Sequence, residues 1–395
     1  MSPDLIVIGA GPAGLAVAIA AARNRIDTLV IERRQLPIDK ACGEGLLPNG
    51  VDALGRLDVP LATLRRSAAT LVGIRYITAA GRTASSLFPS GVGLGLRREC
   101  LSQALAARAR EESSLELRSG VQADVHMGSG GPLVTVGRTT WRPRLVIGAD
   151  GLRSQVRQAC GIVSDLARRR RWGVRQHFSG EPWSDHVEVY FGRGFEAYVT
   201  PVAGGVNVAW LWEQGAVELA GVPGTNVCQM FLPRIPALAA RLEGRRATDR
   251  PQAAGPFQHQ PRERARDGVL LVGDAAGYLD PLTGEGVGLA LAQSELFEQH
   301  VVPVLVARRH QVLPASAFGS YLRAVDVASK PNRDLTRLML SMAGKPAIVE
   351  RVVTALSRDP RLFQHCLDAN MGRRPFWPPP IASLLKLPVA VAIGG

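Results

Sequence analysis

The stretch "LIVIGAGPAGLAVAIAAA", residues 5–22, decides the fold class of this chain. Residues 4–8 have the pattern of a short buried strand, residues 12–24 that of an alanine-rich helix, and residues 27–32 that of a second strand ending in an acid. A strand, a helix and a second strand in this order form a βαβ unit. The stretch therefore predicts an α/β fold that opens with a nucleotide-binding unit.

Three glycines in the spacing GxGxxG follow the first strand. The first permits a tight turn, the second lets the backbone approach a pyrophosphate, and the third lets helix and strand pack closely, while the phosphates meet the helix N-terminus. An acid at the end of the second strand, 18 residues after the last glycine, can accept hydrogen bonds from a ribose diol. The residues expected to bind the dinucleotide here are Gly9, Gly11, Pro12, Ala13, Gly14, Glu32 and Arg33.

An uncharged run of this length could also indicate a membrane span or an export signal. No Lys or Arg precedes the run, however, and Pro12 and the glycines interrupt it before "DTLVIE" forms the second strand. The five cysteines are scattered and form neither a CxxC pair nor a metal-ligand cluster, which is typical of a reducing compartment. We expect a cytoplasmic protein with free thiols and no metal.

The balance of 47 basic against 34 acidic residues gives a net charge of +13. The chain has no zinc-finger spacing and only 5% aromatic residues, so we expect no nucleic-acid partner. The densest basic segment, residues 168–171 with Arg175 close behind, has two interpretations. It forms either a solvated face or a site for the NADPH phosphate, a diphosphate or a lipid headgroup.

The chain length and the alternation of patterns predict interleaved domains. We assign residues 1–66, 91–165 and 255–300 to a discontinuous nucleotide-binding domain, residues 67–90 and 166–254 to a β-sheet substrate domain, and residues 301–395 to a helical C-terminal region. Pro346 and Pro360 suit first helical turns, and Asp359 suits a helix cap. The apolar tail, residues 381–395, is too short to span a bilayer, and it either covers the core or makes a peripheral membrane contact.

Two further segments, "GADGLRSQVR" at 148–157 and "GDAAGYLDPLTGEGVGLA" at 273–290, complete a set of three separated motifs. In this order the motifs resemble the FAD fingerprints of the flavoprotein hydroxylase superfamily, which includes aromatic hydroxylases, geranylgeranyl reductases and flavin-dependent halogenases. The resemblance covers about the first 300 residues. It implies an FAD-binding domain in which the carboxylate of the third motif binds the ribityl hydroxyls and the helix after it faces the flavin pyrimidine. The cofactor-binding residues that it adds are Arg98, Asp150, Gly151, Gly273, Asp274, Pro281, Gly284, Gly286, Val287 and Gly288.

The motifs of this chain differ from those of each subgroup of the superfamily, and these differences limit the reactions that it could catalyse. Gly277 stands where aromatic hydroxylases carry histidine, the WxWxIP string of halogenases is absent, and no lysine lies between Lys40 and Lys330 to relay hypohalite. The segments GDAAG and ACGEG are similar to those of geranylgeranyl reductases. The string "CGEGLLPNGVDAL" and the strands of residues 172–202 resemble more closely bacterial flavoproteins that hydroxylate phenolic lipids and polyketides.

These resemblances predict an FAD-dependent monooxygenase that takes O2 and a hydrophobic aromatic, polyketide or phenolic-lipid substrate. Because only one dinucleotide fingerprint is present, NADPH or NADH would bind transiently as the reductant. The alternative function is reduction of isoprenoid C=C bonds. Less favoured are a halogenase and a non-enzymatic binder of the same fold.

Three side chains are candidates for chemistry. Cys42, with Lys40 nearby, would be either a partly ionised thiol, a covalent anchor or a packing residue beside the flavin. His177 is a general-base candidate for a phenolic proton, unless it is only a strand residue bonded within the protein. Tyr198, together with Trp210 and Trp212, would line an apolar pocket or belong to the core.

Overall fold

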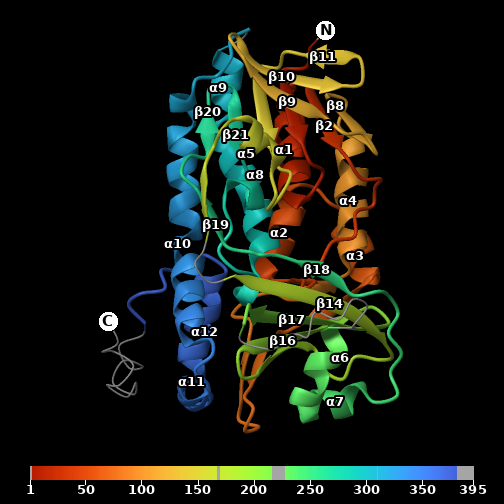
Figure 1. Ribbon diagram of the computed structural model, residues 1–395, viewed down its shortest axis with the longest axis vertical. Helices are drawn as coiled ribbons and strands as arrows, with labels where there is room; N and C mark the ends of the chain where they lie inside the picture. The colour runs from red at the N-terminus through yellow and green to blue at the C-terminus, as the bar shows by residue number, and fades with distance from the viewer. Residues whose placement is uncertain (1, 167–169, 216–226, 309, 380–395) are drawn as a thin grey trace.

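The computed structural model describes residues 2–166, 170–215, 227–308 and 310–379. Figure 1 shows two halves, one above the other. The upper half is built on a six-stranded sheet that is parallel except at one edge. In spatial order its strands are β20 (Ala265–Arg266), β21 (Val269–Leu271), β12 (Leu145–Gly148), β1 (Leu5–Ile8), β2 (Thr28–Glu32) and β8 (Leu115–Ser119). The predicted α/β fold is confirmed.

The opening βαβ unit forms as its sequence predicts. Strands β1 and β2 are buried along their whole length and pair in parallel, because their residues are apolar on both faces. Helix α1 (Pro12–Arg23) follows β1 directly, with Pro12 in its first turn. Its run of small alanines allows α8 (Gly286–His300) to pack closely beside it.

The lower half is a seven-stranded sheet assembled from two regions of the chain. In spatial order its strands are β18 (Gln252–Ala254), β14 (Arg171–Ser179), β17 (Gly205–Glu213), β16 (Phe195–Val202), β15 (His186–Phe191), β5 (Gly73–Ile77) and β6 (Thr83–Leu87). Only β15 and β5 pair in parallel. Helix α6 (Val227–Phe231) packs on one face of this sheet, and the other face borders the cavity described below.

Helices at the end of the described chain join the two halves. The first part of α10 (Gly319–Met342) packs on the upper core through Tyr321, and its second part packs on the lower core through Leu335. Helices α11 (Pro346–Arg358) and α12 (Pro360–Asn370) follow it (Figure 1). The predicted cap is confirmed, since the Asp359 carboxylate accepts a hydrogen bond from the backbone N–H of Arg361 at 3.2 Å.

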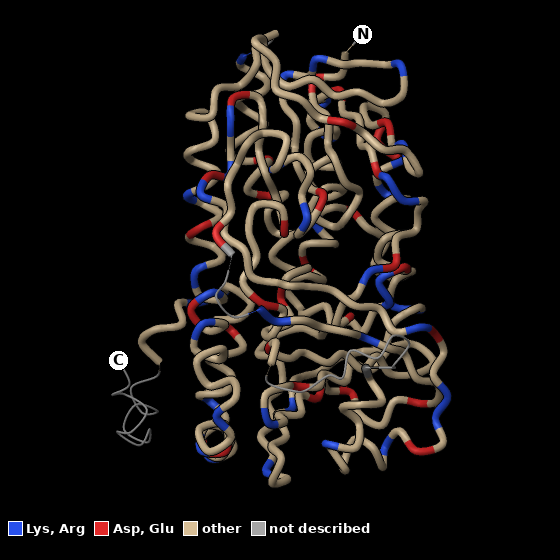
Figure 2. Tube along the Cα trace, viewed as in Figure 1, with Lys and Arg blue, Asp and Glu red and all other residues tan. Residues whose placement is uncertain are grey.

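The charged residues do not gather in one stripe. Figure 2 shows Lys and Arg interspersed with Asp and Glu along the trace of both halves. Within the described ranges, no helix combines the length and the apolar character needed to cross a bilayer. The apolar tail that was considered for membrane contact lies outside the described residues, and the three-domain division stays a prediction.

Candidate active site

The glycine turn between β1 and α1 has the three roles expected from its spacing. Gly9 has a φ of +108°, and an added Cβ would lie 2.5 Å from the Ala149 carbonyl oxygen. A Cβ on Gly14 would lie 2.0 Å from the Gly9 carbonyl oxygen, so this glycine serves the contact of helix and strand. A Cβ on Gly11 would meet no protein atom within 4 Å. Packing therefore requires the first and third glycines, and the space above the second is open to a ligand.

Carboxylates from three separated segments border the same cavity. The two oxygens of Glu32 accept hydrogen bonds from the backbone N–H groups of Ala10 and Arg34, each at 2.9 Å, which fixes the carboxylate at the end of β2. Asp274 pairs with Lys40, with Oδ2 3.3 Å from Nζ. All three motifs thus meet in one place, as the resemblance implied.

Asp150 has one oxygen engaged and one without a partner. Its Oδ2 accepts from the N–H groups of Gln155 at 2.6 Å and Val156 at 3.1 Å, at the start of α5 (Gln155–Ala159). Its Oδ1 is buried and has no hydrogen-bond partner within the described protein. A buried oxygen without a partner is costly unless a ligand supplies the donor.

The N-terminus of α8 lies at the same cavity. Gly284, with a φ of +69°, and Gly286 and Val287 border it, and a Cβ on Gly284 would meet no protein atom within 4 Å. Gly288 was expected to bind the cofactor as well, but it is not among the cavity-lining residues. A Cβ there would lie 2.1 Å from Glu285 Oε1, so Gly288 serves the packing of this helix end.

Arg98 begins α4 (Arg98–Arg110), and only 6% of its surface is exposed. The alternative of a solvated charge at a helix start is therefore wrong, because the side chain borders the cavity. The expected binding residues that line the cavity are Gly9, Gly11, Pro12, Ala13, Glu32, Arg33, Arg98, Asp150, Gly151, Gly273, Asp274, Pro281, Gly284, Gly286 and Val287.

These features fit FAD. The N–H groups at the start of α1 have no side-chain cap, and the open space above Gly11 lies beside them, which suits a pyrophosphate. Glu32 is placed for the adenosine ribose, and Asp274 for hydroxyls of the ribityl chain. The N-terminus of α8 presents its first backbone N–H groups to the part of the cavity beyond these carboxylates, where the N–H groups favour a negatively charged ligand group.

Cys42 borders the cavity from the loop after β2, and the structure corrects the expected state of its thiol. Burial in protein raises the pKa of the thiol, although Arg98 acts in the opposite direction. Lys40, which was expected to promote ionisation, is paired with Asp274. The raised pKa therefore favours the protonated form of the Cys42 thiol at the cavity wall.

Tyr198 also lines the cavity, from the centre of β16. Its hydroxyl donates a hydrogen bond to the Leu282 carbonyl oxygen at 2.7 Å, and burial raises its pKa well above the ordinary value. The tyrosine consequently keeps its proton and connects the sheet to the loop that precedes α8.

His177 does not face this cavity, contrary to its expected role as a general base. It lies beside a second, polar pocket, with Nε2 2.6 Å from Glu44 Oε2 and Nδ1 2.7 Å from Asp249 Oδ2. With both ring nitrogens engaged by carboxylates, it cannot accept a proton from a substrate in the apolar cavity. Sequence patterns gave no signal for Asp249, which lies in a distant loop.

Trp210 and Trp212 share one face of β17, as expected, and Trp210 also borders the cavity. Both pack on Phe231 of α6, with ring centroids 5.4 Å apart in each pair. The cavity side of the same strand carries Ala209 and Leu211. Both tryptophans thus belong to the core beside α6, and Trp210 contributes to the cavity wall as well.

The basic segment at 168–171 is only partly described, because Arg168 and Arg169 lie outside the described residues. Arg171 is buried, with Nη2 2.7 Å from Glu196 Oε2 and Nε 2.9 Å from Asp280 Oδ2. Arg175 is also buried and pairs with Asp39. These two arginines are engaged inside the protein and do not form a phosphate site at the surface.

The far wall of the cavity comes from the C-terminal helices, which the motifs did not indicate. Leu335 of α10 and Cys366, Leu367 and Asn370 of α12 contribute to it. Opposite them lies the apolar face of the seven-stranded sheet, with Val187, Val189, Tyr198, Ala209 and Leu211. The part of the cavity beyond the nucleotide motifs is thus predominantly apolar.

Glu285, immediately before α8, gives a first testable prediction. Burial raises the pKa of its carboxyl to about 8, although the hydrogen bond from Asn49 lowers it. A carboxyl whose pKa is raised by folding stabilises the protein fully only below its ordinary pKa of 4.5, and that contribution is lost progressively as the pH rises to about 8. We expect Glu285→Gln to match the wild type at pH ~4 and to be more stable by about 3 kcal/mol at pH ~9 in urea unfolding. Glu181→Gln, at an exposed position, is the control, and equal curves for E285Q and wild type at both pH values would contradict the prediction.

Comparison with known proteins agrees with this geometry. The profile of a family described as "FAD binding domain" matches residues 3–297. A menaquinone reductase of Mycobacterium tuberculosis is 30% identical over 355 residues, which cover 80% of this chain and 81% of the relative. A digeranylgeranylglycerophospholipid reductase of Methanothermobacter thermautotrophicus is 25% identical over 297 residues, which cover 72% of this chain and 73% of the relative.

A solved structure with the same fold is that of a flavin-dependent brominase. Its TM-score is 0.81 at 16% sequence identity, and the alignment covers 94% of each chain. At this level of identity the likeness concerns the fold alone.

Proposed function

The chain belongs to the FAD binding domain family and is an FAD-dependent oxidoreductase, and from this premise we propose that it reduces carbon–carbon double bonds of a hydrophobic, isoprenoid-like substrate. The observation that carries the proposal is the protonated thiol of Cys42 at the wall of a largely apolar cavity. Saturating a C=C bond requires a hydride on one carbon and a proton on the other. FAD, when bound and reduced, would supply the hydride, and Cys42 holds a proton at Sγ for the second carbon, a proton that water then replaces on the thiolate.

The surroundings of Cys42 support a role as a proton donor and not as a nucleophile. Its carbonyl oxygen accepts a hydrogen bond from Asn207 Nδ2 at 2.9 Å, and its Sγ accepts one from the Glu44 N–H at 3.4 Å. Both contacts fix the turn, and neither removes the thiol proton. A thiol with a raised pKa is a weak nucleophile but retains its proton at neutral pH.

The shape and polarity of the cavity also support an apolar substrate. The sheet face and the α10 and α12 residues that line it are mostly apolar, and the hydroxyl of Tyr198 is already bonded to Leu282. The two curated relatives described above are reductases, one named for menaquinone and one for a geranylgeranyl lipid. NADPH or NADH is proposed as the reductant that renews the flavin.

Hydroxylation of a hydrophobic aromatic by O2 remains the second candidate. It is favoured by the similarity of residues 42–54 to phenolic-lipid and polyketide hydroxylases and by the same dry cavity. Phenol hydroxylation gains from a base that removes the phenolic proton, and His177, the expected base, is engaged elsewhere. This is why reduction is proposed first.

The test is a reaction without oxygen. The FAD-loaded protein is reduced with dithionite under argon and incubated with a menaquinone or a geranylgeranylated lipid, and the product is weighed by mass spectrometry. Gain of two hydrogens in the isoprenoid chain, located by fragmentation after any quinol has been reoxidised in air, supports double-bond reduction. Gain of one oxygen atom from 18O2, seen only in air and with NADPH or NADH, would instead establish the hydroxylase.

Replacement of the thiol gives the second prediction. We expect Cys42→Ala to slow double-bond reduction about 100-fold, the usual contribution of a positioned general acid, with little change in the Kd for FAD. Cys160→Ala, in the core beside β12 and away from the cavity, is the matched control and should reduce substrate at the wild-type rate. Equal rates for C42A and C160A would show that Cys42 only packs.

A further inference from the structure

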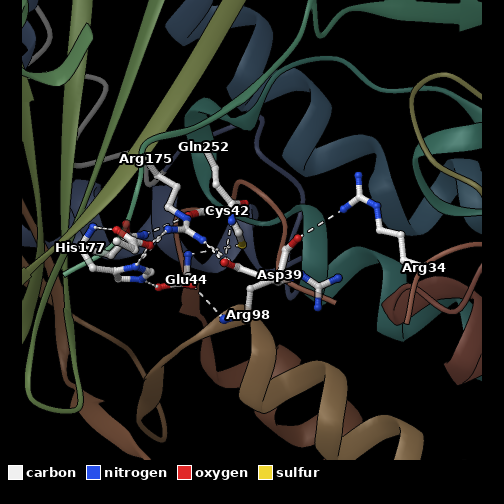
Figure 3. A network of polar contacts seen from close by, with 10 residues as sticks. Arg34, Asp39, Cys42, Glu44, Arg98, Arg175, His177 and Gln252 are labelled. Carbon is white, nitrogen blue, oxygen red and sulfur yellow. Dashed lines mark hydrogen bonds and ion pairs between the residues drawn. The ribbon is translucent and has the colours of Figure 1, made fainter. Parts of the chain in front are cut away.

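A loop that borders the FAD cavity is held onto the seven-stranded sheet at three points. This cofactor loop, residues 39–45, contributes Lys40, Cys42 and Glu44 to the cavity wall. At its start, Arg175 of β14 donates to both oxygens of Asp39, at 2.6 Å and 2.5 Å (Figure 3). In its middle, Asn207 of β17 holds the Cys42 carbonyl at 2.9 Å.

The third point is the contact of Glu44 with His177. Glu44 Oε2 lies 2.6 Å from His177 Nε2, and Glu44 Oε1 accepts from the Arg98 N–H at 2.8 Å (Figure 3). Glu44 has a φ of +61°, in the left-handed region that residues other than glycine rarely adopt. A strained conformation of this kind persists only when contacts hold it. The bond to His177 is thus part of what keeps the cofactor loop in place.

His177 is placed between two carboxylates. Its Nδ1 lies 2.7 Å from Asp249 Oδ2, while Asp249 Oδ1 accepts from the His177 backbone N–H at 2.9 Å. A neutral imidazole has one N–H donor and one acceptor nitrogen, whereas a carboxylate only accepts. Two close contacts to carboxylates are therefore both satisfied when the ring carries two protons.

The charges around the ring favour that state. The acidic groups at this place are Asp39, Glu44, Glu99 and Asp249, and the basic groups are Arg97, Arg98 and Arg175. Glu44 has a fully buried side chain, and Arg175 is already engaged by both Asp39 and Asp249. Burial alone would raise the pKa of the Asp249 carboxyl, but its hydrogen bonds from His177 hold the pKa below the ordinary value. The competing arrangement is a neutral ring whose Nδ1 accepts from Arg175 Nη1 at 3.0 Å.

We propose that His177 is a positioning residue that must be protonated to fasten the cofactor loop through Glu44, so that FAD binding is linked to the uptake of a proton. The proposal concerns cofactor binding and goes beyond the proposed reaction. The proposal predicts the direction of a pH effect: FAD should bind more weakly at a pH that neutralises the ring than at a pH that keeps it protonated.

The test measures FAD affinity without any turnover. FAD is titrated into the full-length protein stripped of flavin, by calorimetry in phosphate and in Tris, between pH ~6 and pH ~8.5. We expect the Kd to rise about tenfold over this range. We also expect the binding heat to differ between the two buffers, because a proton is taken up from the buffer on binding.

Two variants distinguish a requirement for protonation of His177 from a role of its ring in packing alone. Gln at position 44 can keep the bond from Arg98 and donate its amide to a neutral His177, so Glu44→Gln should bind FAD tightly with no pH dependence. The amide of Gln at position 177 is uncharged and does not titrate, so it cannot offset two carboxylates, and His177→Gln should bind FAD weakly at every pH. His186→Gln, a half-buried histidine on β15 that pairs with Asp185, is the matched control and should behave as the wild type.

The outcomes that overturn the proposal are equally specific. A wild-type Kd that is constant over the pH range, with equal heats in both buffers, would mean that FAD binding takes up no proton at His177. Full pH dependence in E44Q would place the responsible group elsewhere. If H177Q fails to fold, E44Q and the buffer comparison on the wild type still decide the question.

Discussion

Replacement of Gly14 by alanine is expected to lower the free energy of unfolding by about 3 kcal/mol and to abolish FAD binding. The added Cβ would lie 2.0 Å from the Gly9 carbonyl oxygen and 3.1 Å from the Ala149 side chain. The first of these is a backbone atom of the turn itself, which cannot rotate away as the end of a flexible side chain can. Urea unfolding followed by circular dichroism gives the free energy, and flavin fluorescence gives the Kd.

Gly11→Ala is the informative partner of this variant. Its Cβ would meet no protein atom within 4 Å, and its backbone φ of −71° is open to any residue. We expect G11A to unfold at the wild-type urea concentration but to bind FAD about 30-fold more weakly, because the methyl group occupies space meant for the ligand. Gly130→Ala, in an exposed turn, should change neither property. Tight FAD binding by G11A would place the pyrophosphate elsewhere.

The nucleotide-binding half could be predicted because its binding residues belong to short sequence motifs. The spacing of Gly9, Gly11 and Gly14 reflects one turn and one helix end, and both form from neighbouring residues. The carboxylates of the other two motifs directly follow buried strands, and parallel strands bring such ends to the same edge of a sheet. Local sequence patterns were thus sufficient to predict that Asp150 and Asp274 lie near the glycine turn.

The substrate half could be predicted only in outline. Strand β17 is buried along both faces, so alternation separates Trp210 and Trp212 from Ala209 and Leu211 but does not say which pair faces the cavity. The side that α6 covers decides this, and its position depends on long-range packing.

The environment of His177 was equally inaccessible to sequence patterns. Its two carboxylate partners lie 133 and 72 residues away in the chain. The bridge between Phe178 and Ala247 brings Asp249 to His177, and the path of the 39–45 loop brings Glu44 to it. From the sequence, His177 was only a strand histidine and a candidate base. In the folded protein it belongs to a polar network with two carboxylates.

Replacement of Arg171 by methionine is the second large effect that we expect, a loss of about 4 kcal/mol in the free energy of unfolding at pH ~8. Arg171 connects β14 to Glu196 of β16, at 2.7 Å, and to Asp280 in the loop before α8, at 2.9 Å. All three side chains are buried, so methionine would preserve the aliphatic stem but leave two carboxylates without their cation. Removing one partner of a buried ionic group costs far more than the group contributes as a whole.

The pH dependence of this loss identifies its cause. Burial already raises the pKa of the Asp280 carboxyl to about 6, and Arg171 is the main group that opposes the rise. Without the arginine the pKa rises further, and a carboxyl with a raised pKa stabilises the fold below its unfolded pKa and loses that contribution as the pH rises. The deficit of R171M should consequently be largest at pH ~8 and smaller at pH ~5.5 in urea unfolding. Arg262→Met, which removes the exposed pair with Asp165, should leave the unfolding free energy unchanged at both pH values. A deficit of R171M that is the same at both pH values would instead assign the loss to packing of the side chain.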